Sequence, residues 1–384
     1  MPPIPLLISA GEASGDMYAA RLAQALKSRL EVSLFGMGGA QMRAAGVEVI
    51  TDYSEVSVVG ITEIVSHLPS LVRAMRRLVA EATRRKPPFA ILTDFPGFHL
   101  RLARKLRPHD VKNIYYICPQ FWAWRPWRVR VVRRRFTRAL CIFPFEESFF
   151  AKGGVPTKFI GHPLVGHVQA TQSRKDFFAR HSLDPQLPLV AILPGSRRAE
   201  LAQHLPVIRA ACARMQELRR AQFVVAAASS AHLGELQTGW EPNLTVRVVE
   251  NQTYDALGCA DAAIVSSGTA TIEAALLDVP TVVIYRVTPL TALLAKPLVR
   301  TSYLSMVNLI AERRVVPELI QDELTTESVV RETLRLIEDE SARDHLRAGL
   351  AEVRQRLGPP GAVERAADEI ASVIQSAARP SGNA

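Results

Sequence analysis

The chain has 384 residues, of which 48% are hydrophobic and 22% are charged. This composition is typical of a globular protein with two or three domains and excludes a disordered or fibrous chain. The formal net charge is +10, but it is unevenly distributed. The segment 101–138 has 12 basic residues and one acidic residue, a local net charge of +11, and the rest of the chain sums to −1. Such a basic segment indicates an anionic partner: nucleic acid, an acidic membrane surface or a phosphorylated ligand.

The four cysteines are widely spaced and include no CxxC pair. Their spacing argues against a disulfide framework and a structural zinc site, and it suits a reducing compartment. The apolar start of the chain, 1–8, lacks a basic region and leads into a glycine turn, so we interpret it as a strand rather than a signal peptide. No uninterrupted apolar run reaches about 18 residues. We therefore expect a soluble or peripheral protein of the cytoplasm.

The first half of the chain alternates short apolar runs with helical patterns. Strands are predicted at 6–8, 33–35, 90–93, 114–117 and 139–143, and helices at 16–29, 71–85 and 128–136. The second half repeats this pattern, with strands at 190–193, 223–227, 246–249, 262–265 and 281–285 and helices at 199–218, 254–259 and 269–277. Strands separated by helices of this length are typical of parallel βαβ units, whose ligands bind at the carboxyl ends of the strands.

From about residue 325 the pattern is helical, with a break at the Gly-Pro-Pro-Gly sequence of 358–361. The joint between the two halves is placed near 161–163. We therefore predict an α/β protein with two doubly wound, Rossmann-like domains at 1–165 and 166–350, followed by C-terminal helices at 351–384.

The turn after the first predicted strand, SAGEASGD (9–16), is a candidate binding loop. It places Ser14 and Gly15 at a helix start, where backbone N–H groups can approach a ligand. Its spacing matches neither the dinucleotide motif nor the Walker motif. The alternative is a tight turn in which Ser14 or Asp16 caps the helix.

Asp94 follows the apolar run 89–93, at the carboxyl end of a predicted strand. A carboxylate at this place can act as a general base or hold a hydroxyl group, and it equally suits a plain turn. His99 lies five residues further along and could shuttle protons or serve as a surface or capping residue.

Two strand-to-helix turns of the second half are suited to phosphate. In LPGSRRAE (193–200), Arg197 offers a guanidinium for phosphate oxygens, unless it is one of a solvated arginine pair. In SSGT (266–269), Ser267, Gly268 and Thr269 form a cradle for pyrophosphate. Glu273 follows one turn later and could reach a ribose diol or merely suit the helix dipole. No DxD-type acidic cluster occurs in this half, so we expect arginine and helix dipoles, rather than a metal, to neutralise the phosphates.

The basic segment contains three of the four tryptophans of the chain, Trp122, Trp124 and Trp127. Six arginines follow, among them Arg128 and Arg133, on a predicted helix with one apolar face. These residues could stack on nucleic acid bases, anchor a membrane surface, or form a tryptophan core beside a solvated basic helix. A second stretch, 290–304, could be an interfacial segment or an ordinary amphipathic core helix.

Together these motifs resemble the lipid-A-disaccharide synthase family, membrane-associated glycosyltransferases of GT-B fold. The matching stretches are SAGEASGD (9–16), FGMGG (35–39), PQFWAW (119–124), FPFE (143–146), GHPL (161–164), LPGSR (193–197) and SSGTATIEAAL (266–276). They occur in the order of the family over nearly the whole chain. The resemblance implies two domains that face a cleft, with the helices after about residue 351 crossing back onto the first domain.

The resemblance also implies the reaction. The family transfers 2,3-diacylglucosamine from its UDP conjugate to the 6-hydroxyl of 2,3-diacylglucosamine 1-phosphate, with inversion and release of UDP. No cofactor is implied. The expected partners are these two substrates and the inner-membrane surface, where the protein would be peripheral on the cytoplasmic side, and nucleic acid is not expected.

Several residues of this chain match functional positions of the family. Asp94 matches the essential aspartate, Arg197 the essential arginine, and Glu273 and Asn308 match residues that hold the nucleotide. Ser14 and Gly15 fall in the loop on the acceptor side. This chain departs from the family after the essential aspartate, where many members have a second aspartate and an asparagine and this chain has Gly97 and His99. Asp94 is therefore the clearer candidate base.

Other activities stay open on the residues alone. A peptidoglycan-type N-acetylglucosaminyltransferase or a UDP-sugar epimerase would share the fold and the nucleotide motifs. A nucleic-acid-binding protein would use the basic segment 101–138, but it would leave the motifs of the second half without a role.

Overall fold

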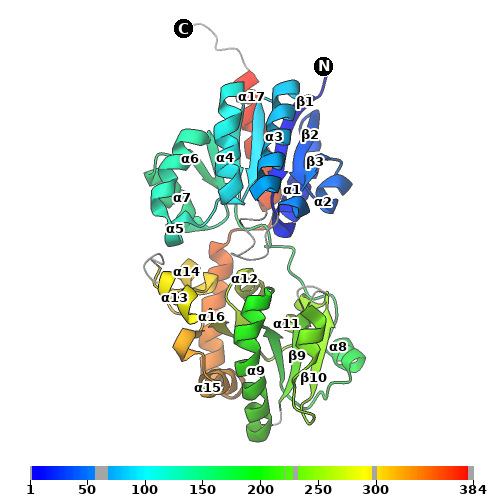
Figure 1. Ribbon diagram of the computed structural model, residues 1–384. Helices are drawn as coiled ribbons and strands as arrows, with labels where there is room; N and C mark the ends of the chain where they lie inside the picture. Colours follow the sequence, from blue (N-terminus) through cyan, green and yellow to red (C-terminus); the bar gives the residue numbers. More distant parts are fainter. Residues whose placement is uncertain (1, 57–67, 220, 228–231, 296–300, 379–384) are drawn as a thin grey trace. The chain divides into compact units, whose positions relative to one another are not determined.

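The computed structural model describes residues 2–56, 68–219, 221–227, 232–295 and 301–378. The chain divides into two compact units (Figure 1). Unit 1 consists of Met1–Pro163 and Gly358–Ala384, and unit 2 consists of Leu164–Leu357. Among the described residues, no helix is both long and apolar enough to cross a bilayer.

Unit 1 contains a seven-stranded parallel sheet in the order β3-β2-β1-β4-β5-β6-β7. The strands are β1 (Ile4–Ala10), β2 (Val32–Gly38), β3 (Glu48–Asp52), β4 (Phe89–Thr93), β5 (Lys112–Tyr116), β6 (Arg138–Cys141) and β7 (Thr157–Phe159). The helices are α1 (Ala13–Lys27), α2 (Ala40–Ala44), α3 (Leu68–Arg85), α4 (Pro96–Leu106), α5 (Phe121–Trp124), α6 (Val129–Arg135), α7 (Pro144–Lys152) and α17 (Ala362–Ala378).

Unit 2 contains a six-stranded parallel sheet in the order β10-β9-β8-β11-β12-β13. The strands are β8 (Leu189–Leu193), β9 (Gln222–Ala227), β10 (Val246–Glu250), β11 (Ala262–Ser266), β12 (Thr281–Tyr285) and β13 (Glu318–Ile320). The helices are α8 (Arg174–His181), α9 (Arg198–Arg219), α10 (Leu233–Gln237), α11 (Thr253–Gly258), α12 (Thr269–Leu276), α13 (Pro289–Ala295), α14 (Met306–Ala311), α15 (Thr326–Glu338) and α16 (Glu340–Arg356).

The central strands are apolar runs that helices cover on both faces. Every residue of β4, β8 and β11 is buried, which explains why these strands lack the polar alternation of a half-exposed sheet. The two sheets and their intervening helices confirm the predicted α/β class with two doubly wound halves and a helical C-terminal stretch. The short strands β3, β7 and β13 were not predicted.

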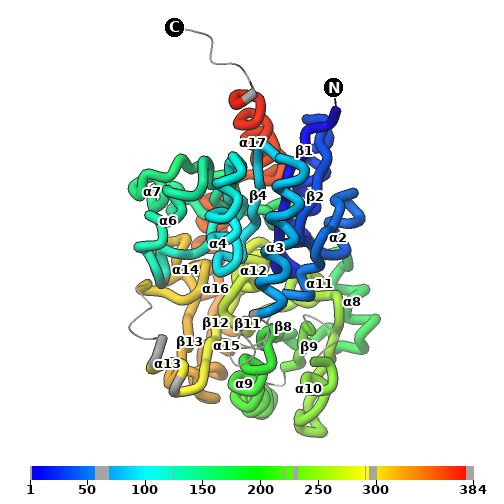
Figure 2. Tube along the Cα trace, turned by 45° about the horizontal axis from the view of Figure 1, so that its top comes forward, coloured from blue at the N-terminus to red at the C-terminus, as the bar shows by residue number. Residues whose placement is uncertain are grey.

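The predicted boundary between residues 350 and 351 falls inside a continuous helix. Helix α16 runs through it to Arg356 and packs against α12 and α14 of unit 2, which Figure 2 shows side by side. The chain returns to unit 1 at Gly358, whose φ of 85° is in the left-handed region. Helix α17 then packs against α1, and Arg29 and Arg138 form ion pairs with Asp368 and Glu369 of α17. The change of unit thus comes after α16, not within it.

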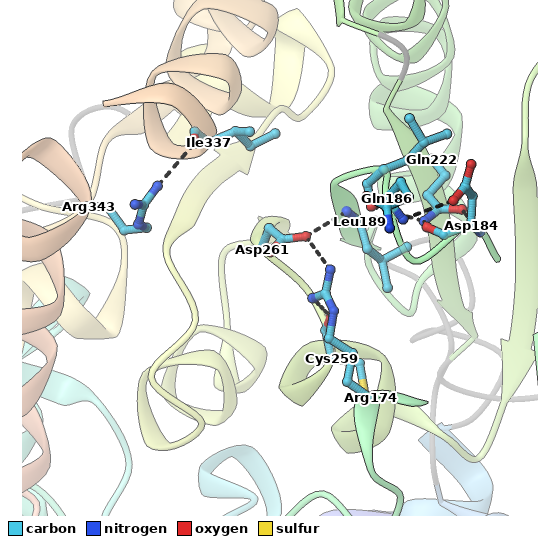
Figure 3. A network of polar contacts seen from close by, with 10 residues as sticks. Arg174, Asp184, Gln186, Leu189, Gln222, Cys259, Asp261, Ile337 and Arg343 are labelled. Atoms are coloured by element: carbon cyan, nitrogen blue, oxygen red, sulfur yellow. Dashed lines mark hydrogen bonds and ion pairs between the residues drawn. The ribbon is translucent and has the colours of Figure 1, made fainter. Parts of the chain in front are cut away.

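A polar network fastens the amino ends of two neighbouring strands in unit 2 (Figure 3). The Asp261 carboxylate, just before β11, accepts hydrogen bonds of 2.8 Å from the Leu189 N–H, at the start of β8, and from the Arg174 guanidinium. Arg174 also donates to the Cys259 carbonyl at 2.5 Å. These bonds fix the end of the sheet opposite to the one where ligands of doubly wound sheets bind.

Candidate functional site

Asp94 is held in an uncommon backbone conformation directly after β4. Its φ is 45° and that of Phe95 is 46°, values that cost non-glycine residues about 1–3 kcal/mol each. The Asp94 N–H donates to the Tyr116 carbonyl at 3.1 Å. The Asp94 carbonyl accepts from the Tyr115 hydroxyl at 3.2 Å and lies 2.8 Å from Nδ1 of His99. Both backbone polar groups of Asp94 are therefore hydrogen-bonded to neighbouring elements.

The Asp94 side chain is half-buried beside another acid. Burial and, to a smaller extent, the charge of the Glu12 carboxylate raise the pKa of Asp94 to about 7, although the Phe95 N–H opposes the rise. A carboxylate with a pKa near neutrality combines substantial basicity with a large deprotonated fraction. Asp94 thus has the properties of a general base, and no sequence pattern pointed to the contribution from Glu12.

The first turn lies against the Asp94 turn. A Cβ atom on Gly11 would come within 2.2 Å of the Phe95 ring, so only glycine allows this approach. Of the predicted loop residues, Ser14 is exposed and its hydroxyl donates to the Glu12 carboxylate at 2.8 Å, whereas Gly15 is buried in the first turn of α1. Asp16 does not cap α1. Its carboxylate accepts from backbone N–H groups of residues 39, 41 and 42, at the start of α2.

Trp122 and Trp127 of the basic segment lie in different environments. Trp122 is half-buried, and its indole N–H donates to the Glu146 carboxylate at 3.0 Å. Glu146 is fully buried and also accepts from the backbone N–H groups of Ile142 and Phe143. Burial raises the pKa of Glu146 to about 8, and these three donors oppose the rise. Glu146 belongs to the FPFE stretch (143–146) and is the third residue of α7. This is the usual position of the acidic residue whose side chain caps the N-terminus of a helix.

Trp127 presents the opposite environment, with 60% of the residue exposed. The Arg128 guanidinium lies 5.6 Å from the centroids of both the Trp127 and Phe121 rings. Arg133 lies on α6, where it passes close to Gly154. The side chain of Trp124 and residues 296–300 of the second predicted interfacial stretch lie outside the described part of the structure.

Unit 2 has a pocket of about 620 Å³ at the carboxyl ends of β8 and β11. Five predicted residues line it together: Arg197, Ser267, Gly268, Thr269 and Glu273. The helices α9 and α12 begin at this pocket, so their free backbone N–H groups favour an anion there. The Ser266 hydroxyl, at the end of β11, is buried in the pocket wall without a hydrogen-bond partner in the described structure, so a ligand could satisfy it.

Glu200, in the first turn of α9, directs its carboxylate to the loop that carries Arg197. Its carboxylate accepts from the Ser196 N–H at 3.1 Å and forms an ion pair with the Arg197 guanidinium at 3.2 Å. A Cβ atom on Gly195, where φ is 120°, would lie 2.6 Å from this carboxylate. The Arg197 side chain remains 75% exposed. The loop therefore has the shape of an anion site, and an internal carboxylate already engages part of it.

Glu273 lies across the pocket and accepts a hydrogen bond of 3.2 Å from the Tyr254 hydroxyl. Burial raises the pKa of Glu273, and the Tyr254 bond opposes the rise. No sequence pattern singled out Tyr254, because its partner is 19 residues away and on another element.

Asn308 is not among the residues that line the pocket. It is fully buried, and its amide donates to the Val316 carbonyl and to the Glu318 carboxylate at 3.0 and 2.7 Å. Glu318 in turn accepts from the N–H groups of Leu304 and Ser305. The Leu304 carbonyl accepts a hydrogen bond from the hydroxyl of Ser267, a residue that lines the pocket. Asn308 thus reaches the pocket only through this chain of hydrogen bonds.

The described residues contain no group of three or more histidine, cysteine, aspartate or glutamate side chains arranged to hold a metal ion. Unit 1 thus offers a half-buried carboxylate directly after β4, and unit 2 offers a pocket whose lining suits an anion.

Comparison with known proteins identifies the family of this chain. A profile of the lipid-A-disaccharide synthetase family matches residues 6–371. The chain belongs to this family. The lipid-A-disaccharide synthase of Solibacter usitatus is 45% identical over 372 residues, which cover 96% of this chain and 97% of the relative. The enzyme is therefore a UDP-sugar-dependent glycosyltransferase of lipid A biosynthesis.

Solved structures that resemble the enzyme confirm the predicted GT-B fold. The S. aureus MnaA–UDP structure has a TM-score of 0.68 at 12% identity and covers 99% of this chain and 100% of that chain. CalG4, the calicheamicin glycosyltransferase, has a TM-score of 0.60 at 16% identity, with coverages of 99% and 100%. At these identities the similarity concerns the fold alone.

The proximity of Glu12 yields a prediction for Asp94. Replacing Glu12 by Gln removes a negative charge, so the pKa of Asp94 should fall from about 7 towards the usual aspartate range. Carboxyl NMR titration of the protein labelled at aspartate would measure this shift, with Asp94→Asn to assign the resonance. An unchanged titration midpoint in Glu12→Gln would show that Glu12 does not act on Asp94.

Proposed function

We propose that the enzyme transfers 2,3-diacylglucosamine from UDP-2,3-diacylglucosamine to the 6-hydroxyl of 2,3-diacylglucosamine 1-phosphate. The products would be the β-1,6-linked disaccharide 1-phosphate and UDP. Family membership supports this pair of substrates, and the single observation that carries the chemistry is the half-buried Asp94 with a pKa of about 7. The proposal assigns the acceptor to the unit with Asp94 and the donor to the unit with the pocket.

The reaction is a single displacement in this proposal. The acceptor oxygen forms a bond to the sugar C1 while its proton passes to the Asp94 carboxylate. The bond between C1 and the phosphate oxygen breaks, and UDP leaves with the electron pair. One displacement inverts C1 and requires no covalent intermediate, by the same stereochemical logic as inverting glycosidases.

Donor binding is proposed to rest on the pocket of unit 2. Arg197 and the backbone N–H groups of Gly268 and Thr269 would neutralise the pyrophosphate, where negative charge grows as UDP leaves. The Glu273 carboxylate, oriented by Tyr254, would accept hydrogen bonds from the ribose hydroxyls. Asn308 would act indirectly, by holding the segment that receives the Ser267 hydroxyl.

Replacing Asp94 by Asn should reduce turnover by about 10²–10⁴-fold without weakening UDP binding, because the amide cannot accept the proton. Mass spectrometry of the products from both acylated substrates would measure turnover, and calorimetry would measure UDP affinity. In the unmodified enzyme, kcat/KM should fall as the pH drops through about 7, since protonated Asp94 is not a base. Near-normal disaccharide formation by Asp94→Asn would refute the assignment, and an unmodified enzyme without disaccharide product would refute the proposed reaction.

Arg197→Ala should weaken UDP binding by about 10–100-fold, the effect of losing one or two charge-assisted hydrogen bonds to phosphate. Its neighbour Arg198 does not line the pocket, so Arg198→Ala is a matched control that removes the same charge. Calorimetric titration with UDP would compare the three proteins. Equal affinities of Arg197→Ala and Arg198→Ala would show that the interaction is a general charge effect.

We also propose that the enzyme is peripheral on the cytoplasmic face of the inner membrane. Trp127 is exposed beside the arginines of α6, a combination suited to the interface of an anionic bilayer. Acylated substrates supply a reason for such contact. The described α13 offers a second exposed apolar side chain, Leu293, in unit 2.

Trp127→Ala should lower partitioning onto phosphatidylglycerol-containing vesicles by about tenfold, equivalent to about 1.4 kcal/mol of interfacial anchoring. Leu218→Ala is the control, because Leu218 is also a largely exposed apolar residue but lies on α9. Vesicle sedimentation at low and high salt would measure binding. If both variants bind as the unmodified enzyme does, the Trp127 surface is not the anchor.

A further inference from the structure

Two buried histidines share one arrangement, and neither has a role in the mechanism above. His99 lies in the first turn of α4, after the Asp94 turn, and His204 lies in the second turn of α9, after the Arg197 loop. Both residues are completely buried. Each unit thus contains one histidine directly behind the turn that carries its proposed functional residue.

The hydrogen bonds of His99 determine its tautomer. Nδ1 lies 2.8 Å from the Asp94 carbonyl oxygen, which can only accept, so Nδ1 carries the hydrogen. Nε2 lies 2.8 Å from the hydroxyl of Ser9 and in the neutral ring must accept from it. Burial lowers the pKa of His99 to about 4, which keeps the ring neutral at physiological pH. The imidazole therefore links β1 to the carbonyl of Asp94 itself.

His204 has the same tautomer in unit 2. Its Nε2 accepts from the Arg286 N–H at 2.9 Å, so Nδ1 carries the hydrogen and donates to the Pro194 carbonyl at 2.7 Å. Burial is also the main cause that lowers the pKa of His204. This imidazole connects the residue after β12 to the loop of Gly195 and Arg197.

Both carbonyls belong to turns with positive backbone φ angles. Asp94 and Phe95 have φ values of 45° and 46°, and Gly195, which follows Pro194, has a φ of 120°. The non-glycine conformations of Asp94 and Phe95 persist only where surrounding contacts hold them, whereas glycine adopts such a φ without steric cost. In each case Nδ1–H of the buried imidazole donates to the carbonyl at the turn. The second ring nitrogen, Nε2, accepts from a residue in or directly after a neighbouring strand.

We propose that His99 and His204 are positioning residues, in which the neutral Nδ1–H imidazole holds the Asp94 turn for reaction at the acceptor and the Pro194–Arg197 loop for donor binding. The kinetic consequences of this inference rest on the proposed function, whereas the tautomers and contacts of the two histidines do not. It excludes proton shuttling by His99, because both ring nitrogens are engaged with groups inside the protein.

Replacement of the two histidines should affect different kinetic quantities. His99→Leu should reduce kcat by about 10–100-fold with UDP affinity unchanged, because a misplaced base affects the chemical step. His204→Leu should weaken UDP binding by about tenfold and affect kcat less. His99→Asn and His204→Asn place an N–H donor near the position of Nδ1, so each should restore most of the loss.

Leu102→Ala in α4 and Ile208→Ala in α9 are the controls, since both shorten buried apolar side chains about one turn further along the same helices. Assays well below the unfolding temperature of every variant separate positioning from loss of folded protein. If the leucine variants change kcat and UDP affinity in the same proportion, or if the asparagine variants restore nothing, positioning is refuted.

An imidazole ¹⁵N NMR spectrum of the unmodified enzyme tests the inference without any assay of activity. A protonated Nδ1 and an unprotonated Nε2 on both histidines are expected, and the leucine variants assign the signals. An Nε2–H tautomer on either residue would overturn the inference for that site. If the tautomers are as expected but the protein forms no disaccharide, the proposed function is refuted and the inference about the hydrogen bonds of the two histidines stands.

Discussion

The reversal of strand order within each sheet is the constraint on which the rest of the structure depends. It lies between β1 and β4 in unit 1 and between β8 and β11 in unit 2. At such a reversal the two connections leave towards opposite faces of the sheet, so helix starts and strand ends surround a space that no connection crosses. The Asp94 turn and the pocket with Arg197 both lie at these points. The apolar, fully buried strands fix where their last residues lie.

The Asp94 turn depends on that rigid sheet because its own conformation is unfavourable. The Asp94 turn uses hydrogen bonds from β5, through Tyr115 and Tyr116, to hold non-glycine residues at positive φ. The Arg197 loop uses Gly195 and the carboxylate of Glu200. Burial in the same region raises the pKa of Asp94. The packing that stabilises the fold therefore also sets the basicity of the candidate base.

The sequence allowed the central strands and most of the pocket to be predicted, because both follow from local pattern. Long apolar runs mark buried strands, and polar residues directly after them must lie at the carboxyl edge of a parallel sheet. The edge strand β7 has only three residues, none of them fully buried, so it lacks that pattern. Trp122 and Trp127 are close in sequence yet differ in environment, because Glu146 lies 24 residues from Trp122. Asn308 likewise faces inward for reasons that only Glu318 and the segment 315–316 explain.

The return of the chain to unit 1 at Gly358 has a consequence for the order of folding. Unit 2 is formed by one continuous segment, whereas unit 1 is completed by α17, which follows all of unit 2 in the chain. A ribosome would thus release the whole of unit 2 while the surface of α1 that α17 covers is still bare. That apolar surface would be open to chaperones or to a second nascent chain until synthesis reaches α17. The enzyme can therefore mature only after translation of this helix, however early its first strands form.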